Sequence, residues 1–527
     1  MSGEPWWRHA VVYQIYPLSF QDSDGDGYGD LRGIRVRLEY LDWLGVDAIW
    51  LSPIYPSPMA DFGYDVADYT GVDAVFGTLA EFDALLAEAH ARGIRLILDF
   101  VPNHSSDRHP WFVESRTARD ARRRDWYIWR DPAPGGGPPN NWLSVFGGSA
   151  WAYEEATGQY YYHAFLNEQP DLNWRNPAVR EAMHGALRFW LDRGVDGFRL
   201  DAIWHLIKDE RFRDNPPNPA YRPDQPPFFS LLPVYSTDRP EVHDVLAELR
   251  RTIDAYADRL LIGEIYLPIE RLIAYYGKDL AGLHLPFNFS LIQAAWKAHR
   301  LAALVEEYER ALPPGGWPNW VLGNHDKHRI ATRVGSAQAA VAAMLLLTLR
   351  GTPTLYYGDE IGMRDVALPA DRVRDPWARD RPAFGRDAAR TPMQWDAGAG
   401  AGFTEGMPWL PVAEDLEACN VASQRADPSS LLHLYRALIA LRRTEPALLS
   451  GSYEPVVVSG DALAFRRRHD TRSLLVALNL GGATQRLLLP SGMRGRIALG
   501  TRLDRGGERV SAVLTLRGDE GVIVRLE

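Results

Sequence analysis

Four short stretches constrain the fold most, because each is a run of apolar residues that ends in reactive polar side chains. They follow one another as residues 96–107 (LILDFVPNHSSD), 197–206 (GFRLDAIWHL), 260–266 (LLIGEIY) and 320–329 (WVLGNHDKHR). Each apolar run has the length of a β-strand and is followed by Asp, Glu, His, Asn or Arg. Parallel barrels carry their chemistry on the loops at the C-terminal ends of the strands, and these stretches predict that arrangement.

The rest of the chain alternates strand-like runs with helical patterns. Apolar residues recur at spacings of three and four in residues 79–92 and 179–193, which predicts amphipathic helices there. This alternation indicates a parallel sheet covered by helices, and eight units favour closure into an α/β fold of the (β/α)8 TIM-barrel type. The eight expected strands are residues 11–16, 48–52, 96–101, 197–200, 260–265, 283–289, 320–322 and 353–357.

Two segments do not fit the barrel repeat. Residues 105–173 separate the third and fourth strands and contain PAPGGGPPNN and GQYYYHAF, which predicts an inserted subdomain over the active face. After a helix at 431–443, residues 451–527 alternate Val, Leu and Ile with polar residues between Gly-rich turns, which predicts a C-terminal antiparallel β-sandwich. The catalytic barrel is then formed by residues 1–104 and 174–450.

Composition excludes several classes of partner. The chain has 527 residues and a formal net charge of −10 without a long basic run, which argues against nucleic acids and anionic membranes. The single cysteine, Cys419, excludes an intramolecular disulfide. The start, MSGEPWWRHAVVYQIYP, lacks the pattern of a signal peptide, and the longest apolar stretch, 339–349, is shorter than the roughly 20 residues that cross a bilayer. We therefore expect a soluble cytoplasmic protein, whose oligomeric state the sequence does not indicate.

Three acids stand at successive strand ends. Arg199 and Asp201 lie two apart on a strand, so they share a face, and the guanidinium favours the ionised form that a nucleophile needs. Glu264 closes an apolar strand that can keep it protonated, and Asp326 lies in NHDKH. Carboxyls with separated pKa values are typical of glycoside cleavage. Each acid alone could be an ion-pair partner or a helix cap, but three together favour catalysis.

A second acidic cluster has the spacing of a metal loop. Oxygen ligands alternate in DSDGDGYGD, which suits a structural Ca²⁺, or Mg²⁺ in its place. The twelfth position of the loop is Gly33 instead of the glutamate of an EF-hand, so an EF-hand helix pair is excluded; an acidic turn without metal is the alternative. No motif for an organic cofactor is present. The expected metal ligands are Asp22, Asp24, Asp26, Tyr28 and Asp30.

The four stretches resemble the conserved regions of the α-amylase superfamily of retaining glycoside hydrolases, most closely its α-glucosidase/oligo-1,6-glucosidase branch. The similarity extends through VYQIYPLSFQDSDGDGYGDL, SPMADFGYDVADY, QPDLNW and ARTPMQW, and it covers the barrel and the insertion. The resemblance implies that Asp201 is the nucleophile, Glu264 the general acid/base and Asp326 the acid that stabilises the distorted sugar. It also implies that Arg199 orients the nucleophile.

The same resemblance implies a binding pocket for one terminal glucose. His104 and His325 would bind hydroxyls of the sugar that is cleaved. Asp61 and Tyr64, in DFGYD, would hold and stack on the non-reducing glucose, and Arg390, in ARTPMQW, would close the pocket behind it.

Three further positions are read through the resemblance. Asp99 and Asn103 are similar to residues that hold loops at the strand ends. Lys208 matches the lysine that α-glucosidases place where amylases bind calcium between barrel and insertion. Ala202 follows the nucleophile, where members that favour α-1,6 bonds tend to have valine.

These features lead to a specific expectation: a retaining exo-α-glucosidase that acts on maltose and malto-oligosaccharides, with α-1,4 bonds favoured over α-1,6. Cleavage would pass through a covalent glucosyl intermediate on Asp201, with the two reacting carboxyls about 5–5.5 Å apart. An α-glucosyl transferase or a trehalose-forming isomerase is the alternative, since only the acceptor differs. A non-catalytic member is disfavoured because all three acids are present.

Overall fold

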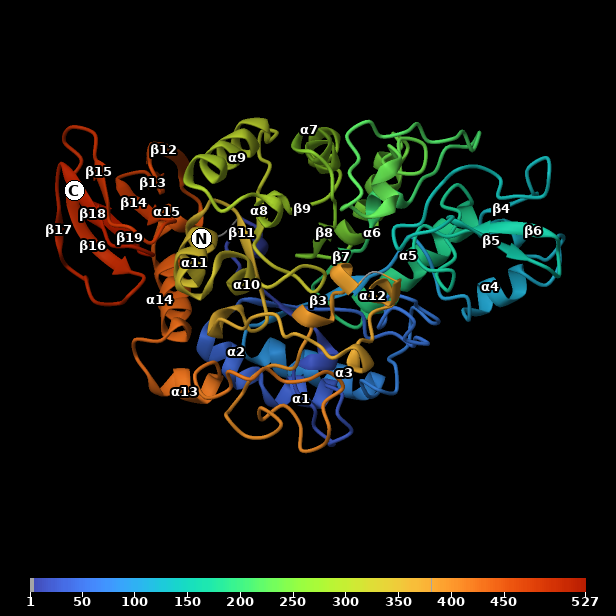
Figure 1. Cartoon of the computed structure of the whole chain (residues 1–527), viewed down its shortest axis with the longest axis horizontal. Coiled ribbons are helices and arrows are strands. Elements are labelled where there is room, and N and C mark those ends of the chain that lie inside the picture. Colours follow the sequence, from blue (N-terminus) through green and yellow to red (C-terminus); the bar gives the residue numbers. More distant parts are fainter. Residues whose placement is uncertain (1–3, 381) are drawn as a thin grey trace.

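The centre of the molecule is a closed, eight-stranded parallel barrel. The computed structural model describes residues 4–380 and 382–527, and its barrel strands follow the order β1-β11-β10-β9-β8-β7-β3-β2. All eight expected strands are found, so the predicted TIM barrel is confirmed (Figure 1). The strands are β1 (Val12–Ile15), β2 (Ala48–Leu51), β3 (Arg95–Phe100), β7 (Gly197–Leu200), β8 (Leu260–Gly263), β9 (Leu285–Asn288), β10 (Asn319–Val321) and β11 (Thr352–Tyr356).

The barrel strands are apolar because both of their faces are buried. Trp50, Ile97, Ile262 and Phe287 belong to one buried cluster contributed by four different strands, and such side chains fill the interior of a barrel of this size. The opposite faces pack against the surrounding helices, so the sequence of each strand reads as a continuous apolar run instead of an alternation.

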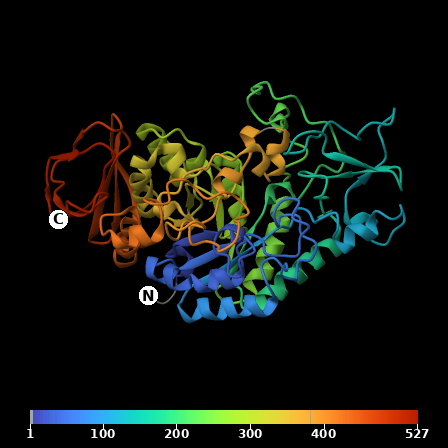
Figure 2. The same ribbon diagram turned by 60° about the horizontal axis from the view of Figure 1, so that its bottom comes forward.

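Helices surround the barrel (Figure 2), and several of them begin at a residue whose side chain caps the helix. At the start of α3, Thr78 accepts a hydrogen bond from the backbone of Glu81, whose side chain reaches back to Thr78, which is a capping box. The apolar stretch 339–349 belongs largely to the buried helix α11, and no helix of the described residues is long and apolar enough to cross a membrane. The α-helices are α1 (Leu31–Val36), α2 (Leu38–Leu44), α3 (Leu79–Ala91), α4 (Pro110–Ser115), α5 (Pro177–Asp192), α6 (Val242–Asp254), α7 (Ile269–Leu272), α8 (Ser290–Gln293), α9 (Ala298–Ala311), α10 (Ile330–Val334), α11 (Ser336–Thr348), α12 (Pro376–Asp380), α13 (Val421–Ala426), α14 (Leu431–Thr444) and α15 (Pro446–Leu449).

The insertion between β3 and β7 contains a small antiparallel sheet. Its strands β4 (Trp129–Arg130), β6 (Gln159–Tyr162) and β5 (Trp151–Glu154) lie side by side in that order. The sheet packs on an aromatic cluster that includes Trp142, Trp151 and Tyr162. In Figure 1 the insertion forms one end of the molecule, and the C-terminal sheets form the other.

The C-terminal part is antiparallel, as predicted. A six-stranded sheet, in the order β12-β13-β14-β19-β16-β17, shares an apolar core with the pair β15-β18. The boundaries 104/105, 173/174 and 450/451 between the three parts remain predictions. The C-terminal strands are β12 (Ser452–Ser459), β13 (Ala462–His469), β14 (Arg472–Asn479), β15 (Gln485–Leu488), β16 (Gly495–Gly500), β17 (Arg509–Val510), β18 (Val513–Leu516) and β19 (Gly521–Leu526).

A buried arginine of this part joins it to the barrel, and a second buried arginine, within the barrel part, supports the same helix end. Arg467, on β13, donates hydrogen bonds to the carbonyl oxygens of Thr348, Leu448 and Gly451 at 2.6, 3.1 and 2.9 Å. Arg442, on α14, donates to neighbouring carbonyls at the same end of α11. Unpaired carbonyls at a helix C-terminus favour such cations, so the two side chains satisfy groups that would otherwise be buried without partners.

Candidate active site

The predicted acids meet at the carboxyl end of the barrel. Leu200 of β7 is paired with Gly263 of β8, so the residues that follow, Asp201 and Glu264, leave adjacent strands at the same level. Asp326 lies in the loop after β10. All three line one cavity of about 740 Å³.

A single guanidinium connects the two acids. Arg199, fully buried, places Nη1 2.8 Å from Asp201 Oδ1 and Nη2 2.9 Å from Glu264 Oε2. Nη1 also lies 2.8 Å from Asp99 Oδ1. Because three carboxyls share one cation, Arg199 fixes their relative positions. Asp99, which the sequence identified only as a scaffold at the strand end, therefore contacts the residue that orients the reacting pair.

Burial and mutual repulsion set the charge of these acids. Burial raises the pKa of Asp201 well above its ordinary value, the neighbouring Glu264 adds to the increase, and Arg199 only opposes it. Burial also raises the pKa of Asp99 to about 6 against the effect of Arg199. The expectation that Arg199 alone keeps Asp201 ionised is thus incomplete.

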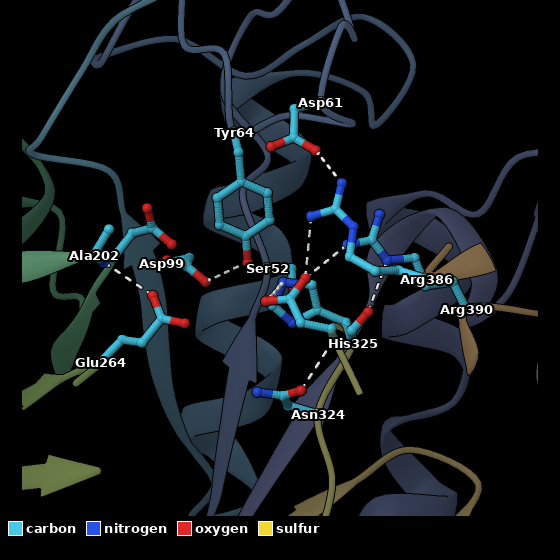
Figure 3. A network of polar contacts seen from close by, with 12 residues as sticks. Ser52, Asp61, Tyr64, Asp99, Ala202, Glu264, Asn324, His325, Arg386 and Arg390 are labelled. Atoms are coloured by element: carbon cyan, nitrogen blue, oxygen red, sulfur yellow. Dashed lines mark hydrogen bonds and ion pairs between the residues drawn. The ribbon is translucent and has the colours of Figure 1, made fainter. Parts of the chain in front are cut away.

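A strained residue orients Glu264. Ala202, next to Asp201, adopts the left-handed region with φ of 46°, which few residues other than glycine occupy. In this conformation its backbone N–H points at Glu264 Oε2 and donates a hydrogen bond of 2.9 Å (Figure 3). The strain therefore provides a donor for the candidate acid/base.

Asp326 is held by two arginines and a histidine. Its Oδ1 accepts hydrogen bonds from Arg390 Nη2 at 2.8 Å and Arg386 Nη1 at 3.2 Å, and its Oδ2 lies 3.4 Å from His325 Nε2. Burial opposes ionisation, but these three groups outweigh it and hold the pKa of Asp326 well below its ordinary value. Asp326 is accordingly a permanent anion, unsuited to donate a proton.

The loop after β2 closes one end of the cavity. Arg386 Nη2 lies 2.6 Å from Asp61 Oδ1, and Tyr64 donates a hydrogen bond of 3.0 Å to Asp99 (Figure 3). The ring of Tyr64 stacks on His325, with centroids 5.2 Å apart and an angle of 5°. This end of the site is a rigid wall of charge and aromatic surface.

Both predicted histidines reach the cavity as neutral side chains. His104 lies 3.2 Å from Gln169 Nε2, and burial lowers its pKa to about 4. His325 Nδ1 lies 2.8 Å from Gln14 Nε2, and burial lowers its pKa well below the ordinary value. Neutral imidazoles can donate and accept hydrogen bonds without adding charge, which suits the binding of sugar hydroxyls.

The structure gives different positions to two arginines, Arg386 and Arg390, and the sequence pointed only to Arg390. Arg390 is fully buried behind Asp326, where its Nε donates to the carbonyl of His325 at 2.8 Å, and it does not line the cavity. Arg386, which the sequence reading missed, lines the cavity and contacts Asp61. Asp375, also missed, fixes Arg386 through contacts of 3.0 and 2.8 Å. Arg386 lies four residues before Arg390, outside the motif ARTPMQW, and only its distant partners reveal it.

Aromatic side chains from several loops complete the cavity. Phe146 of the insertion approaches Trp377 of the segment after β11, with centroids 5.3 Å apart. Tyr266, two residues after Glu264, stacks on Phe289 at 4.3 Å. Other apolar or aromatic residues that line the cavity are Phe165, Trp204, Pro226, Phe228, Phe229, Pro233, Ile265, Leu267 and Phe384.

Three acids of the predicted metal loop lie close together. One carboxylate oxygen each of Asp22, Asp24 and Asp30 lies within 4.8 Å of the others, a donor set of hard oxygens that fits Ca²⁺ or Mg²⁺. Asp26 is outside this group and accepts a hydrogen bond of 2.8 Å from the backbone N–H of Tyr28. The ring of Tyr28 stacks on Trp409.

A lysine occupies the junction of barrel and insertion. Lys208, almost fully buried, forms an ion pair with Asp171 and donates a hydrogen bond of 2.9 Å to Asn103 Oδ1. Asn103 also donates to Asp171 at 2.9 Å. Lys208, which the resemblance identified, therefore lies at the interface of barrel and insertion, where its ammonium supplies a positive charge.

Comparison with known proteins identifies the family. The model of the α-amylase catalytic domain matches residues 14–451. The chain belongs to the α-amylase family of glycoside hydrolases. A probable alpha-glucosidase of Rhizobium meliloti is 43% identical over 503 residues, which cover 92% of this chain and 91% of the relative. An oligo-1,6-glucosidase of Halalkalibacterium halodurans is 40% identical, with coverage of 90% and 91%.

A solved structure of another protein is nearly the same over its whole length. The crystal structure of an alpha-glucosyl transfer enzyme superposes with a TM-score of 0.95 at 41% sequence identity, over 100% of both chains. The relatives place this α-amylase-family chain in the glucosidase branch, as the sequence indicated.

Proposed function

We propose that the protein is a retaining exo-α-glucosidase that removes the terminal non-reducing glucose of short α-glucosides such as maltose and malto-oligosaccharides. The observation that carries this proposal is the pairing of Asp201 and Glu264 across one guanidinium, inside a cavity whose end is closed by the Asp61–Arg386 ion pair. A closed end accommodates a chain terminus and excludes the interior of a polymer.

The proposed reaction is a double displacement. The Asp201 carboxylate attacks the anomeric carbon while Glu264 transfers its proton to the glycosidic oxygen, so the aglycone leaves as an alcohol. Glu264, now a carboxylate, takes a proton from water, and the resulting hydroxide equivalent displaces Asp201 and releases glucose with its original configuration. Asp326, a fixed anion, stabilises the positive charge that develops on the sugar ring.

Closure of the pocket explains the preference for small substrates. We assign Asp61 and Arg386 to the hydroxyls of the terminal glucose, Tyr64 to the face of its ring, and His104 and His325 to the remaining hydroxyls. Arg390 acts behind Asp326 as a positioning residue. Ala202 leaves room beside the nucleophile, which supports the preference for α-1,4 over α-1,6 bonds.

Asp201→Asn tests the assignment of the nucleophile. The amide keeps the size of the side chain but cannot form the ester, so we expect turnover of maltose to fall on the order of 10³-fold or more with little change in unfolding temperature. Proton NMR of the wild-type products should show α-glucose first, because two inversions retain configuration. Near-full activity of the variant, or initial release of β-glucose, would contradict the proposal.

Transfer of glucose to another acceptor is the second candidate. The similarity to an alpha-glucosyl transfer enzyme and the many aromatic residues around the cavity favour it, since an apolar mouth retains an acceptor and limits water. Chromatography of the products from maltose separates the outcomes. Free glucose alone indicates hydrolysis, longer oligosaccharides indicate transfer, and trehalose indicates isomerisation.

A structural cation completes the proposal. Asp22, Asp24 and Asp30 would hold Ca²⁺, or Mg²⁺ in its place, away from the cavity, where the charge of the ion would relieve the repulsion of three carboxylates. No step of the reaction passes through it.

A further inference from the structure

Lys327 is a cavity residue to which the chemistry described so far gives no role. It follows Asp326 in the stretch 320–329, is half-buried, and lines the same cavity as the three acids. Its ammonium lies over the ring of Tyr266, 5.0 Å from the centroid. In the part of the chain that the structure describes, no carboxylate lies within ion-pair distance of it.

The wall that carries Lys327 is opposite the closed end of the pocket. Tyr266 follows β8 and Phe289 follows β9, and the two rings stack with an angle of 9°. In the closed barrel β9 is four strands away from β2 in either direction, so this wall faces the loop that holds Asp61. A glucose fixed by Asp61 therefore directs its anomeric carbon, and the group bonded to it, toward Tyr266 and Lys327.

The ammonium of Lys327 has donors that a ligand in the cavity can use. Burial lowers the pKa of Lys327, Asp326 and Glu264 counteract the effect, and Arg386 adds repulsion. A lysine has three N–H donors, and the aromatic face of Tyr266 satisfies at most one of them. The remaining donors are available to a molecule bound in the cavity that Lys327 lines, and a substrate that displaces water from them has to replace those hydrogen bonds.

We propose that Lys327 donates hydrogen bonds to hydroxyls of the leaving sugar and thereby selects aglycones that are themselves sugars. Tyr266 and Phe289 supply the apolar face of that site, and Lys327 supplies its polar edge. This inference rests on the proposed glucosidase function and names the determinant of its leaving-group specificity.

The test compares substrates that share the glucose but differ in the leaving group. Maltose offers hydroxyls to Lys327, whereas α-glucosyl fluoride has a leaving group with none. For Lys327→Met we expect kcat/KM on maltose to fall at least tenfold, mainly through KM, and kcat/KM on the fluoride to stay within twofold. Lys327→Arg, which keeps the charge and donors, should restore most of the activity on maltose. Lys297→Met removes an exposed lysine before α9 and is the matched control.

Each outcome has one meaning. A selective loss on maltose with rescue by arginine supports the inference. Equal losses on both substrates by a variant whose unfolding temperature matches that of the wild type, or no loss on maltose, overturn it. If the wild-type protein releases glucose from neither substrate, the proposed function itself fails, and the inference fails with it.

Discussion

At the scale of single residues, burial decides the protonation of several histidines. His163, in the insertion, is almost fully buried, and its Nδ1 lies 2.9 Å from the carbonyl oxygen of Phe165. Its Nε2 has no partner among the described residues. Burial lowers the pKa of His163 from 6.5 to about 4. The folded protein therefore resists a proton that the unfolded chain accepts.

The depressed pKa of His163 makes the stability of the protein depend on pH. Since the folded pKa is depressed, the contribution of His163 to stability is complete above pH 6.5 and is lost as the pH falls toward 4, by about 3 kcal/mol. We expect the unfolding temperature of His163→Gln, which cannot be protonated, to fall less than that of the wild type when the pH is lowered from 7.5 to 5. Calorimetry at both values checks this, with exposed His299→Gln as the control. Parallel curves for wild type and His163→Gln would contradict it.

The residues of the site differ in how far the sequence could predict them. Asp201, Glu264 and Asp326 end apolar strands, and that local pattern was sufficient to find them. The sequence did not point to Arg386, because its role depends on a contact with Asp61, which is 325 positions away in the chain. No local pattern distinguishes it from Arg390, and only the path of the segment after β11 brings it into the cavity.

At the scale of elements, the loop 22–30 shows how the backbone arranges a predicted set of ligands. Alternating oxygens predicted five ligands; the carboxylate oxygens of Asp22, Asp24 and Asp30 converge, whereas Asp26 accepts a hydrogen bond from the N–H of Tyr28. Asp22 accepts hydrogen bonds of 2.7 and 2.8 Å from the backbone N–H groups of Gly25 and Gly27. The backbone thus organises the buried side of the loop, whereas Asp24 is exposed and free to close on an ion.

Calcium titration of two neighbouring variants distinguishes the two ligand sets. A ligand that binds only the folded state raises stability with the logarithm of its concentration, so Ca²⁺ should raise the unfolding temperature of the wild type. We expect Asp24→Ala to abolish the increase and Asp26→Ala to keep most of it, as measured by differential scanning calorimetry with EDTA as the reference. A loss of equal size in both variants would favour the five-ligand loop, and an unchanged response in Asp24→Ala would exclude this site.

At the scale of the whole molecule, the barrel holds one accessory part at each end (Figure 1). The barrel strands could be predicted from their short continuous apolar runs, and helices such as α3, α5 and α14 from their helical patterns of apolar residues. The joints between the parts could not, since they consist of isolated polar side chains such as Arg467 that act on distant carbonyls. The residues around Arg467 in the sequence have the pattern of an ordinary antiparallel strand, so this pattern does not reveal the joint.

Arg467→Met tests the C-terminal joint. The substitution keeps the apolar stem but removes donors from four carbonyl oxygens, and each unsatisfied buried group costs about 1–3 kcal/mol. We expect an unfolding temperature lower by several degrees, while Arg468→Met, on the exposed face of the same strand, should have little effect. A shift of equal size for both variants would show that Arg467 does not act through these carbonyls.

The joint at the other end has a consequence for how the insertion is retained. Lys208 neutralises Asp171 with a charge that is part of the polypeptide. A bound ion dissociates at a finite rate, and chelators or dilution can remove it. The ammonium of Lys208 is covalently part of the chain, so it cannot be removed in this way. The insertion is therefore held by a cation that is present once in every chain, whatever ions the surrounding solution contains.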